Sequence, residues 1–258
     1  MKVESKPERL TREVKEVALK SGASLVGIVS SASIDSFPSH WVGYTIREYI
    51  KKTTDIMPDT KSVIVIGYHV WDDILEIALR KGDHWVYPGY FPLPLITQKI
   101  EQFLQTEGYK IATHPYLISY KRLAQLAGFG PFGKNALIIN PRFGPWIRLA
   151  TVLTNAELTP NKPFEQDLCG SCKNCVEACP VAALTPYKVD DSKCLVGVHL
   201  IGDDLAKHEG MLKKFEPSLT RSAHLMCMEC QKTCKYGKEE HSLYDSEGEK
   251  KGSSVQYY

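Results

Sequence analysis

The residues of this sequence that are best suited to chemistry lie in one stretch, because all eight cysteines fall within residues 169–234. Cys169, Cys172 and Cys175 are separated by two residues each, and Cys179 follows after three more, immediately before a proline. In a run of this kind three thiolates hold one [4Fe–4S] cluster and the fourth thiolate reaches a second cluster. Two such clusters need eight thiolates, which is the number present. The spacing therefore predicts two [4Fe–4S] clusters.

The remaining cysteines suggest how the ligands divide. They are a lone Cys194 and the run Cys227-x2-Cys230-x3-Cys234. If this run mirrors the first, its last cysteine crosses back to the first cluster. The predicted ligands are Cys169, Cys172, Cys175 and Cys234 for one cluster, and Cys179, Cys194, Cys227 and Cys230 for the other. The alternatives are zinc sites and disulfides. Structural zinc uses ligands in two separated pairs, unlike this triple spacing, and disulfides need an oxidising compartment, which nothing in the sequence suggests.

A glycine-rich loop is the second feature that invites a functional interpretation. It reads Gly128-Phe-Gly130-Pro-Phe-Gly133-Lys134-Asn135 and is close to both a dinucleotide fingerprint and a phosphate loop. Both sites need a strand before the loop and a helix after it, whereas the pattern here predicts the reverse order, so we reject both. Gly128, Gly130, Gly133, Lys134 and Asn135 stay candidate cofactor contacts, and Lys134 is expected to face a polar or charged group of the cofactor. Glycines that permit a tight turn are the simpler explanation.

Histidines supply two further candidates. His69 ends the most apolar predicted strand, where α/β sheets often place ligands, and is a candidate cofactor contact. His114 follows another predicted strand, and its imidazole titrates near neutral pH, as a proton donor requires. A lone histidine is more often structural. His199, His208 and His224 lie between cluster cysteines and could tune or ligate a cluster, although the cysteines already suffice.

Apolar periodicity predicts the elements that must position these groups. A helix with a capping box should follow Ser5, with Glu8 as its partner, and a strand buried on both faces should span 62–67. Other helices are expected at 34–52, 74–80, 95–108 and 118–127, a loop at 84–94, and other strands at 24–29, 109–113, 136–139 and 146–153. This alternation predicts an α/β layer domain over 1–160. A two-cluster, bacterial-ferredoxin-like α+β module should follow over 161–240, then a polar tail over 241–258, with disorder beginning at Gly237.

The bulk properties are those of an ordinary soluble globular chain, with 43% hydrophobic and 24% charged residues. The net charge of +2 gives no general attraction to nucleic acid or anionic membrane. The first ten residues are polar, which argues against a secretory signal, and no stretch has the apolar length of a membrane span. We therefore expect a cytoplasmic protein without a membrane partner.

Two segments outside the cysteine stretch, together with the cysteine spacing, resemble the epoxyqueuosine reductase family, which is related to the reductive dehalogenases. They are residues 123–140, LAQLAGFGPFGKNALIIN, and residues 144–150, GPWIRLA. The resemblance also covers the strands at 24–29 and 62–67. It implies an N-terminal α/β domain of the cobalamin-chaperone or nitroreductase-like kind, which binds cobalamin base-off, beside a two-cluster ferredoxin module.

Two departures accompany this resemblance. The family's catalytic Asp, a proton donor, falls at His114, and the family's Arg-Tyr-x-x-Gly-x-Asp-Tyr-His segment falls at residues 87–95, which read YPGYFPLPL. The chain is thus expected to be a divergent relative that has the same two electron-transfer clusters and a different electron acceptor.

The functional prediction is an iron–sulfur oxidoreductase that relays electrons through two clusters to a cofactor or substrate between the domains. A corrinoid is the expected cofactor, and no residue pattern excludes a flavin. The expected donor is a low-potential ferredoxin or flavodoxin, and the acceptor is a small molecule or a corrinoid protein. The alternatives are a protein that reductively activates a redox partner and a genuine tRNA epoxyqueuosine reductase, although tRNA is the less expected partner given the weak net charge.

Overall fold

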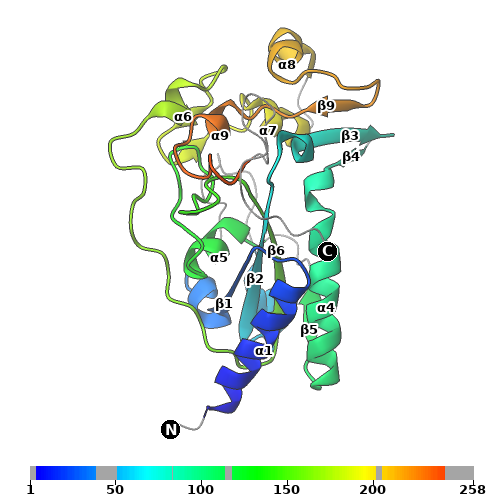
Figure 1. The fold of residues 1–258 in the computed structure, drawn as a ribbon, viewed down its shortest axis with the longest axis vertical. Coiled ribbons are helices and arrows are strands. Elements are labelled where there is room, and N and C mark those ends of the chain that lie inside the picture. Colours follow the sequence, from blue (N-terminus) through cyan, green and yellow to red (C-terminus); the bar gives the residue numbers. More distant parts are fainter. Residues whose placement is uncertain (1–3, 39–50, 83, 114–117, 202–204, 242–258) are drawn as a thin grey trace.

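The central element of the fold is a four-stranded antiparallel sheet (Figure 1). The computed structural model describes residues 4–38, 51–82, 84–113, 118–201 and 205–241. The sheet has the order β1 (Leu25–Ser30), β2 (Ser62–His69), β6 (Ile147–Thr154) and β5 (Ile111–Thr113). Strand β2 pairs with β6 along its whole length, from Ser62 opposite Thr154 to His69 opposite Ile147. The predicted strands at 24–29, 62–67, 109–113 and 146–153 are therefore confirmed to within a few residues.

Alternation along β2 explains why helices cover both faces of the sheet. Ile64 and Ile66 point into a core shared with α1 (Lys6–Lys20) and α4 (Pro92–Thr106). Val63 and Val65 point into a second core shared with α2 (Ser31–Asp35), α3 (Thr53–Ile56) and α5 (Tyr120–Leu126). All four side chains are fully buried, and each contributes roughly 1.5–3 kcal/mol by its burial. The prediction of a strand buried on both faces is confirmed.

Local signals set the helix boundaries where the sequence carries them. Helix α1 begins after Ser5, whose side chain accepts a hydrogen bond from the backbone N–H of Glu8 while the Glu8 carboxylate caps the Ser5 backbone, as predicted. Helix α4 begins at Pro92, three residues earlier than expected, because proline is tolerated in the first turn, where the backbone N–H has no partner. Residues 39–50, most of the helix predicted at 34–52, lie outside the described residues.

The cysteine-rich module packs on one end of this α/β domain (Figure 1). Its elements are short and irregular, as loops that wrap metal clusters require. They are α6 (Asn174–Glu177), β7 (Leu184–Thr185), β8 (Lys188–Val189), α7 (Leu195–Ile201), η3 (Leu205–His208), α8 (Glu209–Phe215), β9 (Ala223–Leu225) and α9 (Glu229–Lys232). Ala136 of the α/β domain inserts into the small apolar core of this module, beside Ala183, Leu184 and Val189.

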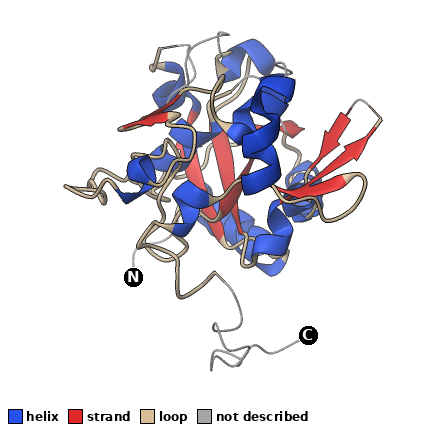
Figure 2. Ribbon diagram, turned by 90° about the horizontal axis from the view of Figure 1, so that it is seen from above, coloured by secondary structure: helices blue, strands red, loops and turns tan. Residues whose placement is uncertain are grey.

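A small three-stranded sheet joins the two parts and contradicts one prediction. The helix expected at 74–80 is only a short 3-10 turn, η1 (Asp73–Glu76), and the chain continues as β3 (Ile77–Lys81). Strand β3 pairs with β4 (His84–Val86) on one side and with β9 of the cysteine-rich module on the other. Figure 2 shows these strands standing apart from the central sheet. The backbone of β9 provides the hydrogen bonds that favour a strand here, and a partner so distant in sequence is invisible to local periodicity.

Two further expectations fail for local reasons. The loop expected at 84–94 contains β4 and a 3-10 turn, η2 (Pro88–Tyr90). The strand expected at 136–139 forms only an isolated bridge between Ile138 and Phe132. Ala136 adopts a left-handed conformation with φ of 59°, which no regular strand accommodates.

The chain beyond the last cysteine returns to the α/β domain. His241 stacks on Trp146 at 3.6 Å between ring centroids, and its two ring nitrogens lie 2.8 Å from the Val70 carbonyl oxygen and an Asp73 carboxylate oxygen. Glu240 pairs with Arg142 at 2.8 Å. Disorder from Gly237 onward is therefore wrong for residues 237–241, which pack as an ordered strap, while 242–258 lie outside the described residues.

Candidate functional site

The first predicted set of cysteines lines one small cavity. Cys169, Cys172, Cys175 and Cys234 surround a space of about 30 Å³ between the α6 loop and the α9 turn. The Asp167 carboxylate accepts hydrogen bonds from the backbone N–H groups of Cys169 at 2.9 Å and of Gly170 at 3.2 Å, which fixes the start of this loop. The structure thus brings together four thiols that lie up to 65 positions apart in the sequence, from 169 to 234.

The second predicted set lines a different cavity. Cys179, Cys194, Cys227 and Cys230 surround a space of about 140 Å³. The Cys179 sulfur accepts a hydrogen bond from the Ala183 N–H at 3.2 Å, and the Glu216 carboxylate accepts one from the Cys227 N–H at 3.0 Å. All eight thiols are free. Cys179 and Cys234 thus each line the cavity formed mainly by cysteines of the other run, and the assignment of four ligands to each cluster stays a prediction.

Burial sets the acid–base character of several of these thiols. It raises the pKa of Cys175 and of Cys227 to about 11, assisted by the charges of neighbouring thiols and carboxylates, and it raises the pKa of Cys230 further. A metal ion binds the thiolate, so metal binding has to displace these protons.

The glycine-rich loop serves the contact between the two parts of the chain. Lys134 is buried, and its Nζ donates to the Gly170 carbonyl oxygen at 2.6 Å, within the first cysteine loop. Asn135 lines both cysteine cavities, and its Nδ2 donates to the Cys230 carbonyl oxygen at 3.4 Å. Gly130 permits a close approach, because a Cβ there would meet the Ile139 carbonyl oxygen.

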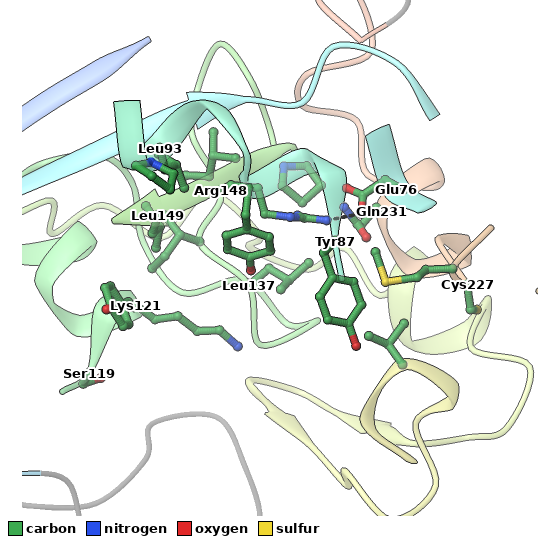
Figure 3. Close-up of a pocket in the computed structure, with 18 residues that line it drawn as sticks. Glu76, Tyr87, Leu93, Ser119, Lys121, Leu137, Arg148, Leu149, Cys227 and Gln231 are labelled. Atoms are coloured by element: carbon green, nitrogen blue, oxygen red, sulfur yellow. Dashed lines mark hydrogen bonds and ion pairs between the residues drawn. The ribbon is translucent and has the colours of Figure 1, made fainter. Parts of the chain in front are cut away.

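A much larger cavity, of about 640 Å³, lies between the α/β domain and the cysteine-rich module (Figure 3). Its apolar walls include Leu93 of α4 and Leu149 of β6, and its polar groups include Tyr87, Tyr90 and Lys121. It shares five lining residues with the second cysteine cavity: Lys121, Leu137, Val196, Cys227 and Gln231. The large cavity and the second set of thiols are therefore direct neighbours.

The inner end of this cavity holds an ion pair that the sequence did not reveal. Arg148 of β6 donates from its terminal guanidinium nitrogen to the Glu76 carboxylate, with side-chain exposures of 13% and 2% (Figure 3). The backbone of Glu76 also accepts from the Met226 N–H at 2.9 Å, so the cysteine-rich module holds the acid in place. Glu76 falls within the wrongly predicted helix, and only the position of Arg148 between two apolar strand residues hinted at a buried charge.

The histidine candidates lie elsewhere or outside the described residues. His69 stacks on Phe143 at 4.5 Å between ring centroids and is absent from the described lining of the large cavity. The rule that places ligands at the carboxyl ends of strands applies to parallel sheets, and this sheet is antiparallel. His224 lies 3.2 Å from the Glu216 carboxylate and edge-on to Trp85. His208 is the N-cap residue of α8. His114 and the side chain of His199 lie outside the described residues.

Comparison with known proteins bears on the cysteine-rich module first. Residues 168–237 match the family described as a 4Fe-4S double cluster binding domain. In the described residues no helix is long and apolar enough to cross a membrane.

Curated relatives extend the similarity into the α/β domain. Epoxyqueuosine reductase of Prochlorococcus marinus is 26% identical over 231 residues, covering 80% of this chain and 72% of the relative. The Bacillus subtilis enzyme of the same name is 26% identical over 72% of this chain and 55% of its own length. The Synechocystis enzyme is 40% identical over 60% of this chain and 56% of its own length. The chain thus spans little more than half of the last two relatives.

Solved structures agree on the fold. A crystal structure of epoxyqueuosine reductase has a TM-score of 0.69 at 20% identity, covering 94% of this chain and 69% of the other. A reductive dehalogenase has a TM-score of 0.62 at 19% identity, and the match covers 93% of this chain and 34% of the dehalogenase. The expected architecture, an α/β domain followed by a double-cluster module, is confirmed. The chain therefore carries a 4Fe–4S double cluster binding domain and resembles epoxyqueuosine reductases over most of its length.

Proposed function

We propose that this chain is an oxidoreductase that relays electrons through two [4Fe–4S] clusters to an acceptor held in the large cavity. The observation that supports this most directly is the position of Cys227, which lines both the second cysteine cavity and the large cavity. A cluster held there adjoins the acceptor with no intervening layer of protein.

In this proposal Cys169, Cys172, Cys175 and Cys234 hold the first cluster, and Cys179, Cys194, Cys227 and Cys230 hold the second. Each bound [4Fe–4S] cluster supplies a one-electron redox centre whose potential, within about −700 to +450 mV, is tuned by hydrogen bonds and exposure. The chain contributes the spacing of the two centres. Asn135 lines both cysteine cavities, so it stands between the clusters and helps to fix their separation.

The first cluster is the entry point for electrons. In the described lining, its cavity shares no residue with the large cavity, and exposed Lys173 and Lys235 lie next to its cysteines. Exposed lysines beside a cluster could contact an acidic donor protein, and ferredoxin and flavodoxin are donors of that kind.

The large cavity fits a planar cofactor such as a corrinoid or a flavin. Its walls are mainly apolar, with aromatic rings at Tyr87 and Tyr90 and a few convergent polar groups, which is the usual lining of a cofactor site. A bound corrinoid would supply a strongly reducing metal centre, and a bound flavin would carry one or two electrons. Leu149, Tyr87 and Tyr90 line the cavity and would contact the bound ring. No lining residue selects one cofactor over the other.

Two alternatives concern the final acceptor. The relatives are named epoxyqueuosine reductase, and one similar solved structure contains an epoxyqueuosine-modified tRNA stem loop, so tRNA is one acceptor, with His114 in the position of the proton donor. The other is a corrinoid or redox protein that this chain reactivates, which needs no proton donor in the cavity.

Anaerobic purification followed by metal and ligand analysis tests the proposal. We expect about eight iron and eight sulfide per chain, and extraction identifies a corrinoid or flavin. Zinc in place of iron, or about four iron per chain, contradicts the two-cluster arrangement. Queuosine content of tRNA from a deletion strain, measured by mass spectrometry, then separates the acceptors, because unchanged queuosine excludes the tRNA reaction.

A further inference from the structure

Three buried polar atoms without a hydrogen-bond partner belong to residues that line the inner end of the large cavity. They are Glu76 Oε1, Arg148 Nε and Gln231 Nε2. Glu76 is 1% exposed and Gln231 is 9% exposed. Figure 3 shows Arg148 reaching toward Glu76, and Gln231 lines the same cavity. Buried polar groups are nearly always paired in folded proteins, so three unpaired atoms on residues of one cavity require an explanation.

These atoms form a complementary set. Glu76 Oε1 is an acceptor, whereas Arg148 Nε and Gln231 Nε2 are donors. A group with a carbonyl oxygen next to an N–H matches this set, because its oxygen accepts from the two donors while its N–H donates to the carboxylate. We propose that this end of the cavity is a binding subsite for a neutral amide or lactam group of the bound cofactor or substrate.

Charge favours a neutral group over an anionic one. The Arg148 guanidinium is already compensated by the Glu76 carboxylate. A ligand carboxylate or phosphate placed there would face the Glu76 charge at close range, in a buried site where such repulsion is poorly screened. The side-chain amide of a corrinoid and the pyrimidine edge of a flavin both carry the required carbonyl and N–H.

The position of the subsite deepens the proposed function, on which this inference rests. Gln231 follows Cys230 directly in the sequence, and Cys227 lines the same cavity. A ligand anchored by its amide at this end lies against the second cluster. Glu76, Arg148 and Gln231 come from η1, β6 and α9, so the subsite exists only when the two parts of the chain are docked.

Binding to the anaerobically purified, cluster-loaded protein tests the subsite with matched probes. The first pair is hydroxocobalamin and its monocarboxylic acids, in which one side-chain amide is replaced by a carboxylate. The second pair is FMN and 3-methyl-FMN, which lacks the ring N–H. We expect one parent compound to bind at least about tenfold more tightly than its matched analogue, equivalent to about 1.4 kcal/mol, and the pair that responds identifies the source of the amide.

Variants assign the effect to named residues. Glu76→Gln leaves the Arg148 charge uncompensated, so for the cobalamin pair the preference should reverse in favour of the acid. Gln231→Met removes one donor and keeps the ion pair, so it should weaken the binding of hydroxocobalamin or FMN, whichever shows the preference, severalfold. This variant also tests the subsite if Glu76→Gln does not fold. Thr151→Val is the matched control, because Thr151 also has a buried unpaired oxygen but does not line the cavity. Thr151→Val should bind each probe as tightly as the unsubstituted protein does.

Equal binding of parent and analogue, or no binding of any probe, overturns the subsite. Iron content and reduction of the clusters by a low-potential donor are measured on the same samples. They report the proposed relay separately, so a protein that takes up electrons but shows no amide preference refutes the subsite alone.

Discussion

Replacing Arg148 with methionine tests the buried ion pair on which the shape of the large cavity depends. The side-chain exposures of Arg148 and Glu76 are 13% and 2%, so the change leaves the Glu76 carboxylate in the protein interior without the counter-charge of Arg148. Removing one partner of a buried pair costs about 3–5 kcal/mol, because the other charge stays desolvated. Total stabilities are about 5–15 kcal/mol. At about 2–4 °C per kcal/mol for a chain of this size, the unfolding temperature should fall by roughly 6–20 °C.

The double variant separates the pair energy from the loss of packing. Glu76→Gln combined with Arg148→Met removes both charges and keeps the side-chain volumes, so it should be more stable than Arg148→Met alone. Arg142→Met is the matched control, because Arg142 pairs with Glu240 at exposures of 68% and 37%, and exposed pairs contribute only about 0–1 kcal/mol. Thermal unfolding of all variants, followed by circular dichroism at one heating rate without oxygen, gives the comparison. If the fall in unfolding temperature of the double variant equals the sum of the falls in Glu76→Gln and Arg148→Met, the two side chains do not interact and the buried ion pair is refuted.

Three other changes test the rest of the site. Cys175→Ala and Cys230→Ala should each lower iron from about eight to about four atoms per chain, and loss of all iron in either variant would contradict two independent ligand sets. Gly144→Ala should destabilise the protein by about 1–3 kcal/mol, because φ there is +57° and a Cβ would meet the Tyr236 carbonyl oxygen, just before the C-terminal strap. Gly210→Ala should not, because a Cβ there would point into open space. Burial, helped by nearby His241, lowers the pKa of His69 to about 4, whereas an unfolded histidine has a pKa near 6.5. Between these values the unfolded chain binds more protons than the folded chain does. The free energy of unfolding should therefore fall as the pH is lowered from about 6.5 to about 4. Unfolding temperatures across this range should flatten in His69→Gln, and an unchanged slope would show that other groups titrate.

Features encoded by short-range spacing were predictable from the sequence. The capping box at Ser5 fixes the start of α1, and the run of branched residues around Ile64 fixes the central strand. The predicted division of the cysteines into two sets also rests on spacing, because the last cysteine of each run follows after three residues instead of two and so points away from the others. Each of these signals depends on residues that are close together in the sequence, so the preferences of those residues are enough to predict it.

Features created by contacts between distant segments were not predictable in this way. Strand β3 has one partner nearby in the sequence, β4, and one distant partner, β9, with Ala78 opposite His224. Glu76 and Arg148 meet across 72 positions of sequence. Periodicity assigned Glu76 to a helix face, where a charged residue is ordinarily solvated. The proposed subsite could not be predicted for the same reason, because its three side chains come from segments far apart in the sequence and only Arg148, between Ile147 and Leu149, stands out among its neighbours.

The docking of the two parts links cluster binding to the cavity. The cysteine-rich module has short elements and a core of few apolar residues, so its fold depends on its metal ligands more than that of the α/β domain does. That same module supplies the Met226 N–H that holds Glu76, the Gln231 amide and the Cys227 wall of the cavity. Cluster loss should therefore disorder the large cavity even though the central sheet remains folded. Under the proposed relay, the cavity is complete only in a chain that has bound its clusters, so an acceptor would bind only to a protein that can reduce it.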